Sequence, residues 1–401
     1  MRLLFLTDNF PPEVNAPASR TYEHCLEWVK QGVEVTVITC VPNFPKGEVF
    51  PGYKNKLYQK ETINGIKIIR VWSYITANTG FSRRICDFIS YAMMAFFFGI
   101  FQRFDVVIGT SPQFFTAVSA RSLGFAKGKP WVMEVRDLWP ESIAAVGAMK
   151  RSSGVYRFLE IIERHLYRSS KAIVVNADGL KSSIEKNGIA HEKIKVIKNG
   201  VMLSDFDIFV KDEFLSKKYN LEGKFLVSYI GTIGMAHALD FIIDCAAGIT
   251  DKRFHFLIIG EGAERQKIIS KASDLKIDNV TFIPSVSKQE INKYIGISNA
   301  ALVNLKKSDT FKAIIPSKIF ENVALKNPIL LGVEGEAKCM IENYKVGICF
   351  EPENKKSFYE ALEKITTFKD DQFIGNCDKM MENYDRSKLA EEMLDFIKSI
   401  I

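Results

Sequence analysis

The stretch KFLVSYIGTIGMAHALDFIIDCA, residues 224–246, decides the fold class. It opens with an unbroken apolar run, passes through a loop that holds Gly231 and Gly234, and continues with apolar residues at helical spacing. Unbroken apolar runs are typical of strands that are buried on both faces of a parallel sheet. A strand followed by a loop and a helix is part of a βαβ unit, so this stretch predicts an α/β fold.

The same pattern recurs in two series, with helical stretches such as 18–30 and 154–170 between the strands. The predicted strands are 2–7, 33–40, 66–72, 105–111, 130–137 and 171–178 in the first series, and 224–232, 255–262, 279–285, 300–306, 327–335 and 346–351 in the second. A polar stretch without periodicity, 199–214, separates the series and is the expected linker. We therefore expect two doubly wound, Rossmann-like domains, 1–198 and 199–384, that face each other across a cleft. Ligands should bind beyond the carboxyl ends of the strands.

Composition excludes several classes of protein. The 401 residues are 47% hydrophobic and 25% charged, which is typical of a globular chain. The formal charge of +7 is not gathered into a basic stripe, so we expect no nucleic acid partner. The seven cysteines form no CxxC pair, which favours reduced thiols and no zinc site. Asp8 and two prolines interrupt the first apolar run, so we expect a buried strand there rather than a signal peptide.

Two loops of the first domain hold candidate ligand contacts. The loop TDNFPPEVNAPASR has no glycine, which argues against a nicotinamide or flavin cofactor. Asn15 and Arg20 in this loop either face a ligand or belong to a rigid loop with a solvent-exposed arginine. In EVRDLWPES, Asp137 either acts as a base or hydrogen-bond acceptor or caps the following helix. Arg136 is a second candidate there, with pairing to Glu134 or Glu141 as its structural alternative.

Glycines and a lysine mark the loops of the second domain. Gly231 and Gly234 lie between a strand and a helix, where exposed amides and the helix dipole could hold a phosphate, and Gly260 repeats the pattern one strand later. Each could instead be a simple turn glycine. In FKAIIPSKIFENVALKNPILLG, 311–332, Lys318 falls in the first turn of a helix, where a positive charge is unfavourable. Such a local conflict is expected at a functional site, although a surface pair with Glu321 is the alternative.

The order of these motifs resembles the retaining glycosyltransferases of family 4, which have the two-domain GT-B fold. The matching pieces are PPEVNAPASR, RDLWPES, VIKNGV, YIGTIGMAHALD, IIGEG, FIPSVSKQEI and IPSKIFENVAL. They resemble bacterial transferases that build lipid-linked surface polysaccharides such as O-antigen or capsule, including N-acetyl-fucosamine transferases. The resemblance implies that the C-terminal helix, 385–401, packs back on the first domain. Of the family's two glutamates separated by seven residues, the second matches Glu321, whereas Ala313 occupies the first position. His237 stands about where the family has a lysine, so Lys318 would take over the phosphate charge.

The resemblance and the loops together give a set of site residues. Expected catalytic residues are Asp137 and Lys318. Expected donor-binding residues are Gly231, Thr232, Gly234, His237, Gly260, Ile283, Ile315, Ser317, Lys318 and Glu321. Expected acceptor-binding residues are Asn15, Arg20 and Arg136. We expect neither a cofactor nor a metal.

The implied reaction is transfer of a sugar, such as an N-acetylated deoxy-amino sugar, from a nucleoside diphosphate to a lipid-linked saccharide, with retention at the anomeric carbon. The base suggested by the resemblance is uridine. Two alternatives remain open, because a non-hydrolysing sugar-nucleotide epimerase shares the fold and the ligand, and the missing carboxylate at Ala313 would suit a non-catalytic sugar-nucleotide binding protein.

The stretch RRICDFISYAMMAFFFGIFQRF, 83–104, has an uncharged run that is too short to span a bilayer as a helix. It could be a buried connecting helix. Its aromatic residues and basic flanks also describe a helix that lies in an anionic membrane interface. The expected membrane contacts are Arg83, Arg84, Phe97, Phe98 and Arg103, on a cytoplasmic protein that is peripheral on the inner face of the cell membrane.

Overall fold

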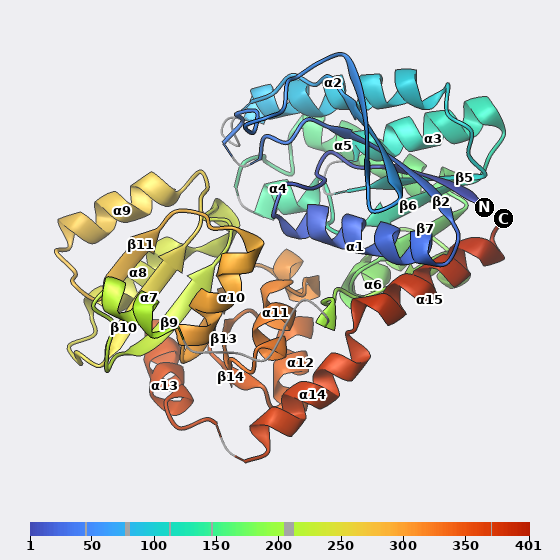
Figure 1. Cartoon of the computed structure of the whole chain (residues 1–401). Coiled ribbons are helices and arrows are strands. Elements are labelled where there is room, and N and C mark those ends of the chain that lie inside the picture. Colours follow the sequence, from blue (N-terminus) through green and yellow to red (C-terminus); the bar gives the residue numbers. More distant parts are fainter. Residues whose placement is uncertain (45, 77–80, 112–113, 146, 204–211, 370) are drawn as a thin grey trace. The chain divides into compact units, whose positions relative to one another are not determined.

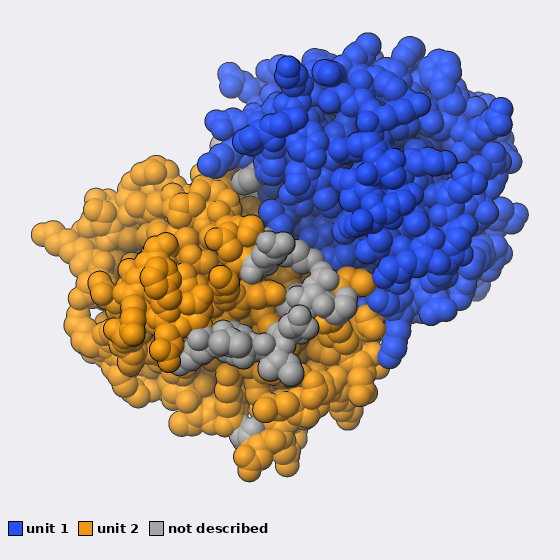
Figure 2. Space-filling model, viewed as in Figure 1, with its two compact units in different colours: residues 1–199, 386–401 blue, residues 200–385 orange. Residues whose placement is uncertain are grey.

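A computed structural model of the chain describes residues 1–401 except 45, 77–80, 112–113, 146, 204–211 and 370. The chain forms two compact units (Figure 2): residues 1–199 with 386–401, and residues 200–385. The expected boundary at 198/199 lies one residue from this division. Each unit has a sheet covered by helices, so the expected α/β fold with two Rossmann-like domains is confirmed (Figure 1).

The first unit has an eight-stranded sheet with the order β3-β4-β2-β1-β5-β6-β7-β8. Its strands are β1 (Arg2–Leu6), β2 (Glu34–Cys40), β3 (Tyr58–Ile63), β4 (Ile66–Val71), β5 (Val106–Thr110), β6 (Trp131–Val135), β7 (Ala172–Val175) and β8 (Ile194–Val196). Its helices are α1 (Ala16–Lys30), α2 (Phe81–Gly99), α3 (Phe115–Lys127), α4 (Glu141–Ala145), α5 (Gly154–Ser169), α6 (Asp178–Lys186), the 3-10 turn η1 (His191–Lys193) and α15 (Arg386–Ser399). The edge strand β3, which pairs antiparallel with β4, was not predicted.

The second unit has a six-stranded parallel sheet with the order β11-β10-β9-β12-β13-β14. Its strands are β9 (Phe225–Ile230), β10 (Phe254–Ile259), β11 (Val280–Ile283), β12 (Ala300–Asn304), β13 (Ile329–Gly332) and β14 (Gly347–Cys349). Its helices are α7 (Glu213–Lys218), α8 (Leu239–Ala247), α9 (Arg265–Asp274), α10 (Lys288–Ile297), α11 (Lys318–Ala324), α12 (Glu336–Tyr344), α13 (Lys355–Ile365) and α14 (Phe373–Asn383), with 3-10 turns η3 (Met235–His237) and η4 (Asp309–Ala313). Strand order reverses between β9 and β12, which is where open α/β sheets bind ligands.

The last helix, α15, belongs to the core of the first unit. Its buried side chains include Leu394 and Met393, which pack with Phe5 and Trp28 in one hydrophobic cluster. The Trp28 indole donates a 2.8 Å hydrogen bond to the Ala390 carbonyl, and Arg386 pairs with Glu23 of α1. The helix therefore covers the same face of the sheet as α1.

Helix α2 has apolar side chains both on the side that faces the sheet and on the side that faces solvent. Tyr91 and Ala95 are buried toward the sheet, whereas Met93 is 66% exposed and Phe97 55% exposed. Phe98 is half-buried, and the centroid of its ring lies 4.8 Å from that of the Tyr58 ring. Our expectation that the Phe98 ring faces a membrane is therefore wrong.

The three expected basic contacts on and after α2, Arg83, Arg84 and Arg103, are exposed. In the part of the chain that the structure describes, no helix combines the length and the apolarity needed to cross a bilayer.

We predict that the first unit depends on α15 for its stability. Leu394 has no exposed surface, so Leu394→Ala should lower the free energy of unfolding by about 2–5 kcal/mol through lost burial and a cavity. The neighbouring Asp395→Ala, an exposed change on the same helix, should stay within about 0.5 kcal/mol. Urea unfolding followed by circular dichroism measures both. Equal stability of the two variants would show that α15 is dispensable to the core.

Candidate functional site

The site in the second unit is built where the loops after β9 and β12 meet. The amide of Lys306 donates to the Ala236 carbonyl at 2.8 Å, and the Asn304 side-chain amide donates to the His237 carbonyl at 2.9 Å. These bonds hold the 231–238 loop against the start of the 305–317 loop. Both loops follow the strands that flank the reversal of strand order, so the side chains of this region share one edge of the sheet.

Lys318 lies over an aromatic ring at this edge. It is the first residue of α11, as predicted for the first turn, and its ammonium is 3.5 Å from the centroid of the Tyr229 ring. Burial lowers the pKa of Lys318 to about 7, and the nearby Glu321 raises it in part. The ring offers its negative face to the cation and compensates some of the lost hydration. The result is a lysine poised to gain charge when an anion arrives.

His237 completes the surroundings of the lysine. Its ring lies edge-on to Tyr229 at 5.9 Å, and burial together with the Lys318 charge lowers its pKa to about 3. A neutral imidazole is therefore expected at physiological pH. Its Nδ1 is buried beside the Gly234 backbone and has no hydrogen-bond partner of good geometry among the described residues. The Tyr229 hydroxyl donates to the Thr232 carbonyl at 2.5 Å, which fixes the ring beneath the lysine.

The glycines of this edge serve close backbone packing, which corrects the expectation of exposed amides. The Gly231 amide donates to the Ile259 carbonyl, and the Gly260 amide donates to the Ile283 carbonyl. Gly260 has φ +146, and a Cβ there would lie 1.9 Å from the Gly231 carbonyl oxygen. These two amides are therefore committed to protein carbonyls. Gly231 matters for a different reason, because a Cβ there would meet the Lys318 side chain at 2.9 Å.

The other predicted donor contacts divide into two groups. Ile283 is buried in a hydrophobic cluster with Leu257 and Tyr294, so its side chain has a packing role, and its donor contact stays a prediction. Ile315 is buried as well. Ser317 precedes α11 without capping it through its side chain, and Glu321 lies one turn beyond Lys318.

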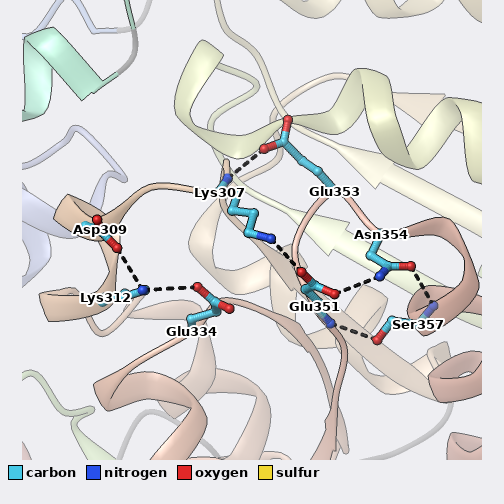
Figure 3. A network of polar contacts seen from close by, with 8 residues as sticks. All are labelled: Lys307, Asp309, Lys312, Glu334, Glu351, Glu353, Asn354 and Ser357. Carbon is cyan, nitrogen blue, oxygen red and sulfur yellow. Dashed lines mark hydrogen bonds and ion pairs between the residues drawn. The ribbon is translucent and has the colours of Figure 1, made fainter.

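An ion-pair network joins the neighbouring loops after β12, β13 and β14 (Figure 3). Lys312 pairs with Asp309 at 2.7 Å and with Glu334 at 3.6 Å, and Lys307 pairs with Glu351 at 2.5 Å. The network continues through Glu353, Asn354 and Ser357. These two lysines are engaged by carboxylates, whereas Lys318 lies over an aromatic ring. A phosphate could therefore engage Lys318 without breaking an ion pair of the network.

The first unit has a buried charged cluster at the carboxyl edge of its sheet. Arg20 is 1% exposed and donates to Glu134 at 2.9 Å and to the carbonyls of Ile197 and Lys198. This placement corrects both of our expectations for Arg20, which neither faces a ligand nor lies in solvent. Glu134 forms its ion pair with Arg20, and its negative charge also attracts the Arg136 guanidinium.

Arg136 and Asp137 keep open polar atoms. The Arg136 Nε and Nη1 are buried without a partner among the described residues, and burial lowers the pKa of its guanidinium to about 10. Burial raises the pKa of Asp137 to about 7, although hydrogen bonds from Ser142 and the Leu138 amide oppose the rise. The bond to Ser142 ties Asp137 to α4, in line with the capping alternative, while its Oδ1 is buried and unpartnered in the described structure.

Asn15 has a local structural role. Its side chain caps α1 by accepting from the Ala18 amide at 2.8 Å and donates to Asn9 at 2.6 Å. Both halves of the amide are therefore engaged within the loop.

Sequence reasoning missed Tyr229 and Asn304, which hold the lysine and the loop in place. The signal for Tyr229 was an aromatic residue with a polar hydroxyl two positions before a glycine, at the end of the buried strand FLVSYI. Asn304 likewise ends an aliphatic strand.

Comparisons with known proteins agree with the two-unit architecture. The family model Glycosyltransferase Family 4 matches residues 18–205, and the model Glycosyl transferases group 1 matches residues 211–386. A putative colanic acid biosynthesis glycosyl transferase of Escherichia coli (strain K12) is 24% identical over 91% of this chain and 92% of its own length.

Two solved structures share the fold over the whole chain. Sucrose-phosphate synthase from Thermosynechococcus elongatus has a TM-score of 0.76 and 13% identity, covering 100% of this chain and 98% of that one. Anabaena HepE in complex with UDP-glucose has a TM-score of 0.71 and 12% identity, covering 100% of both chains.

We predict that Gly231→Ala disturbs Lys318 selectively. Gly231 has φ +141 and its new Cβ would push on the Lys318 chain, so the lysine should leave the Tyr229 ring and UDP affinity should fall about tenfold. Gly234→Ala is the matched control, since the nearest atom to its Cβ is 3.7 Å away and its φ is −126. Isothermal titration calorimetry measures both. Equal affinity of the two variants would contradict a phosphate role for Lys318.

We also predict that UDP binding takes up a proton above pH 7. The pKa of Lys318 is about 7 in the free protein, so at pH 8 the lysine is mostly neutral, and an approaching diphosphate should raise its pKa and charge it. Calorimetry in buffers of different ionisation enthalpy should show uptake of about one proton per UDP at pH 8 and little at pH 6. Lys318→Ala should abolish the difference. Binding at pH 8 without proton uptake would show that the diphosphate does not approach this lysine.

Proposed function

We propose that this chain is a two-domain glycosyltransferase, because residues 18–205 match the family 4 model and residues 211–386 match the group 1 model. We further propose that it transfers a sugar from a nucleoside diphosphate to a saccharide acceptor. The proposed nucleotide is UDP, the proposed acceptor is lipid-linked, and the proposed setting is synthesis of a bacterial surface polysaccharide. The similarity to the E. coli colanic acid biosynthesis transferase supports the polysaccharide setting, and the similarity to HepE, whose structure holds UDP-glucose, supports the nucleotide. We further propose an N-acetylated deoxy-amino sugar as the donor sugar.

The observation that carries the proposal is the position of Lys318 over Tyr229. Departure of a nucleoside diphosphate leaves negative charge on its terminal phosphate in the transition state. A half-buried ammonium held in advance at the sheet edge stabilises that charge more than a hydrated lysine would, because little reorganisation is needed during the reaction. The neutral His237 beside it can accept or donate a hydrogen bond without adding a second positive charge.

In the proposed reaction, the bond from the anomeric carbon to the phosphate oxygen breaks and a bond from the same carbon to the acceptor oxygen forms on the same face. The acceptor proton passes to the departing phosphate oxygen. In the first unit, Asp137 would orient the acceptor through its open Oδ1, and Arg136 would meet an anionic part of the acceptor through its open Nε and Nη1.

We propose that no metal takes part in the reaction, although one sequence motif argues for a metal. The sequence contains an Asp-x-Asp tripeptide, Asp205 to Asp207, of the kind that binds divalent metals in other transferases. Our expectation of a metal-free reaction rested in part on the sequence having no such tripeptide, and that premise was wrong. These residues lie outside the described part of the structure. Retained turnover in EDTA would support the metal-free proposal, and its loss with recovery on adding Mg²⁺ or Mn²⁺ would reject it.

The outer side of α2 supports a lipid-linked acceptor. Met93 and Phe97 are exposed there, and Phe101 is exposed just beyond the end of the helix. Arg83 and Arg103 lie near the two ends of the helix. Basic residues around an apolar stripe favour an anionic membrane interface. We propose that this side of α2 brings the protein to the cytoplasmic face of the membrane, where such acceptors are held.

A transfer assay tests the function. Purified protein, radiolabelled UDP-sugars and bacterial membranes should yield label in the lipid extract, and Lys318→Ala should lower kcat/KM about 10²–10³-fold. Lys326→Ala is the matched control, because Lys326 pairs with Asp378 away from the site. Epimerised donor in incubations without membranes would favour an epimerase instead. Donor binding with no release of UDP in the presence of membranes would favour a non-catalytic binding protein.

A further inference from the structure

One segment of the first unit accounts for most of the net positive charge of the chain. Residues 81–171 contain thirteen Lys and Arg and seven Asp and Glu, which places +6 of the formal +7 in this segment. The segment includes α2, α3 and α5. A local excess of this size attracts anionic surfaces within about a Debye length of ~8–10 Å.

Helix α5 presents an apolar stripe to solvent that the core does not need. Val155, Phe158 and Ile161 are 57%, 61% and 66% exposed, and their spacing of three places them along one side of the helix. The opposite side already packs inward through Leu159 and Leu166. The exposed stripe therefore has no partner within the described structure of this unit.

Helices α2 and α5 belong to one layer of the first unit. Both contact α3: Ser119 of α3 donates to the Ala92 carbonyl of α2, and Arg121 of α3 donates to Ser169 of α5. Figure 1 shows these three helices gathered on the side of the sheet away from α1. Phe125, at the end of α3, is exposed as well. The two apolar stripes thus lie on the outer side of the same helical layer.

The opposite layer is different in character. None of the large apolar side chains that are exposed in the described structure lies on α1 or α15. Their outer sides carry pairs of opposite charge, such as Glu27 with Lys30 and Asp395 with Lys398. The apolar and basic surface is therefore a property of one layer and not of the whole unit.

We propose that α5 is a second lipid-binding helix, and that with α2 it forms one surface that docks on an anionic bilayer. Phe158 and Ile161 enter the interface, while Arg157, Arg164 and Arg168 contact the headgroup phosphates. The proposal extends the membrane contact in the proposed function from one helix to two. It does not depend on which sugar is transferred.

Charge favours a lipid partner over a second copy of the chain. Arg157 and Arg168 are exposed beside the stripe, and Arg164 is exposed and pairs with Glu160 at 3.3 Å. A symmetric dimer through this surface would bring two copies of the same basic surface together, and the repulsion between their like charges is unfavourable. Phosphate headgroups supply the complementary charge, and the aliphatic parts of the arginines can extend along the apolar surface.

Vesicle binding tests the proposal. The intact protein should co-sediment with 7:3 phosphatidylcholine–phosphatidylglycerol vesicles and weakly with pure phosphatidylcholine. The double variant Phe158→Ser and Ile161→Ser should weaken binding to the anionic vesicles about tenfold, because two apolar side chains no longer enter the interface. Phe214→Ser is the matched control, since Phe214 is 73% exposed on α7 of the other unit.

The readouts separate this proposal from the proposed function. The double variant should keep the thermal midpoint and the UDP affinity of the intact protein, because the stripe lies in the first unit and is exposed. A variant that binds vesicles as tightly as the intact protein would overturn the role of α5, even if Phe97→Ser weakened binding. A dimer of the intact protein that dissociates in the double variant, measured by light scattering, would identify the surface as a self-interface and overturn the lipid proposal. Loss of UDP binding by the intact protein would instead reject the proposed function.

Discussion

A parallel sheet must be covered on both of its faces, and the organisation of this chain follows from that requirement. In the first unit, one face of the sheet presents Leu3, Phe5 and Val37 to α1 and to α15 together. Helix α15 comes from the far end of the chain, so this core is closed only when the last fourteen-residue helix returns to it. The second unit, residues 200–385, is therefore inserted between two parts of the first. The hydrogen bond from Trp28 to the Ala390 carbonyl and the pair between Arg386 and Glu23 fix where the return helix lies.

The same requirement places the chemistry at the strand ends. Ionic groups inside strands that are buried on both faces need a partner, as Glu134 of β6 has in Arg20. The candidate site of the second unit therefore lies at the ends of the strands. In the second unit this brings Lys318 onto the Tyr229 ring, and burial lowers the pKa of the lysine to about 7. The ring lowers the cost of keeping a cation there, and the neutral imidazole of His237 lies beside it. A lysine in water would have to lose its hydration shell in the reaction, whereas this one has already lost much of it on folding.

The strands could be predicted because their apolar runs are continuous, and every predicted strand is present. Strand β3 was missed because its sequence, YQKETI, has the composition of a solvent-exposed edge strand. The Asn64-Gly65 dipeptide that joins it to β4 was the available signal for a hairpin.

Lys318 could be singled out because its place in a first turn conflicts with the helix dipole. Tyr229 beneath it depends on contacts across 89 positions of sequence. The role of Gly260 could not be predicted, because a glycine in a loop can either leave its amide exposed or permit close backbone approach. The structure shows close approach, since a Cβ at Gly260 would lie 1.9 Å from the Gly231 carbonyl oxygen. Arg20 can be buried because it donates hydrogen bonds to Glu134 and to three acceptors at positions 197–199. The sequence around a basic residue on a helix does not reveal partners that lie so far along the chain.

The two helical layers of the first unit show which features folding alone explains. A covering helix needs one apolar side, and α15 has this composition, with charged pairs on its outer side. Helices α2 and α5 have an apolar inner side and an apolar outer stripe as well. The outer stripe adds nothing to the core and is unfavourable in water, and the basic residues beside it do not stabilise a sheet. Packing against the sheet therefore explains the apolar inner side of these helices. Their outer side has the apolar and basic composition of a surface that binds lipid. An enzyme whose acceptor is held in a membrane needs such a surface on the unit that binds the acceptor. The proposed reaction and the outer side of this layer therefore both support the first unit as the acceptor-binding unit.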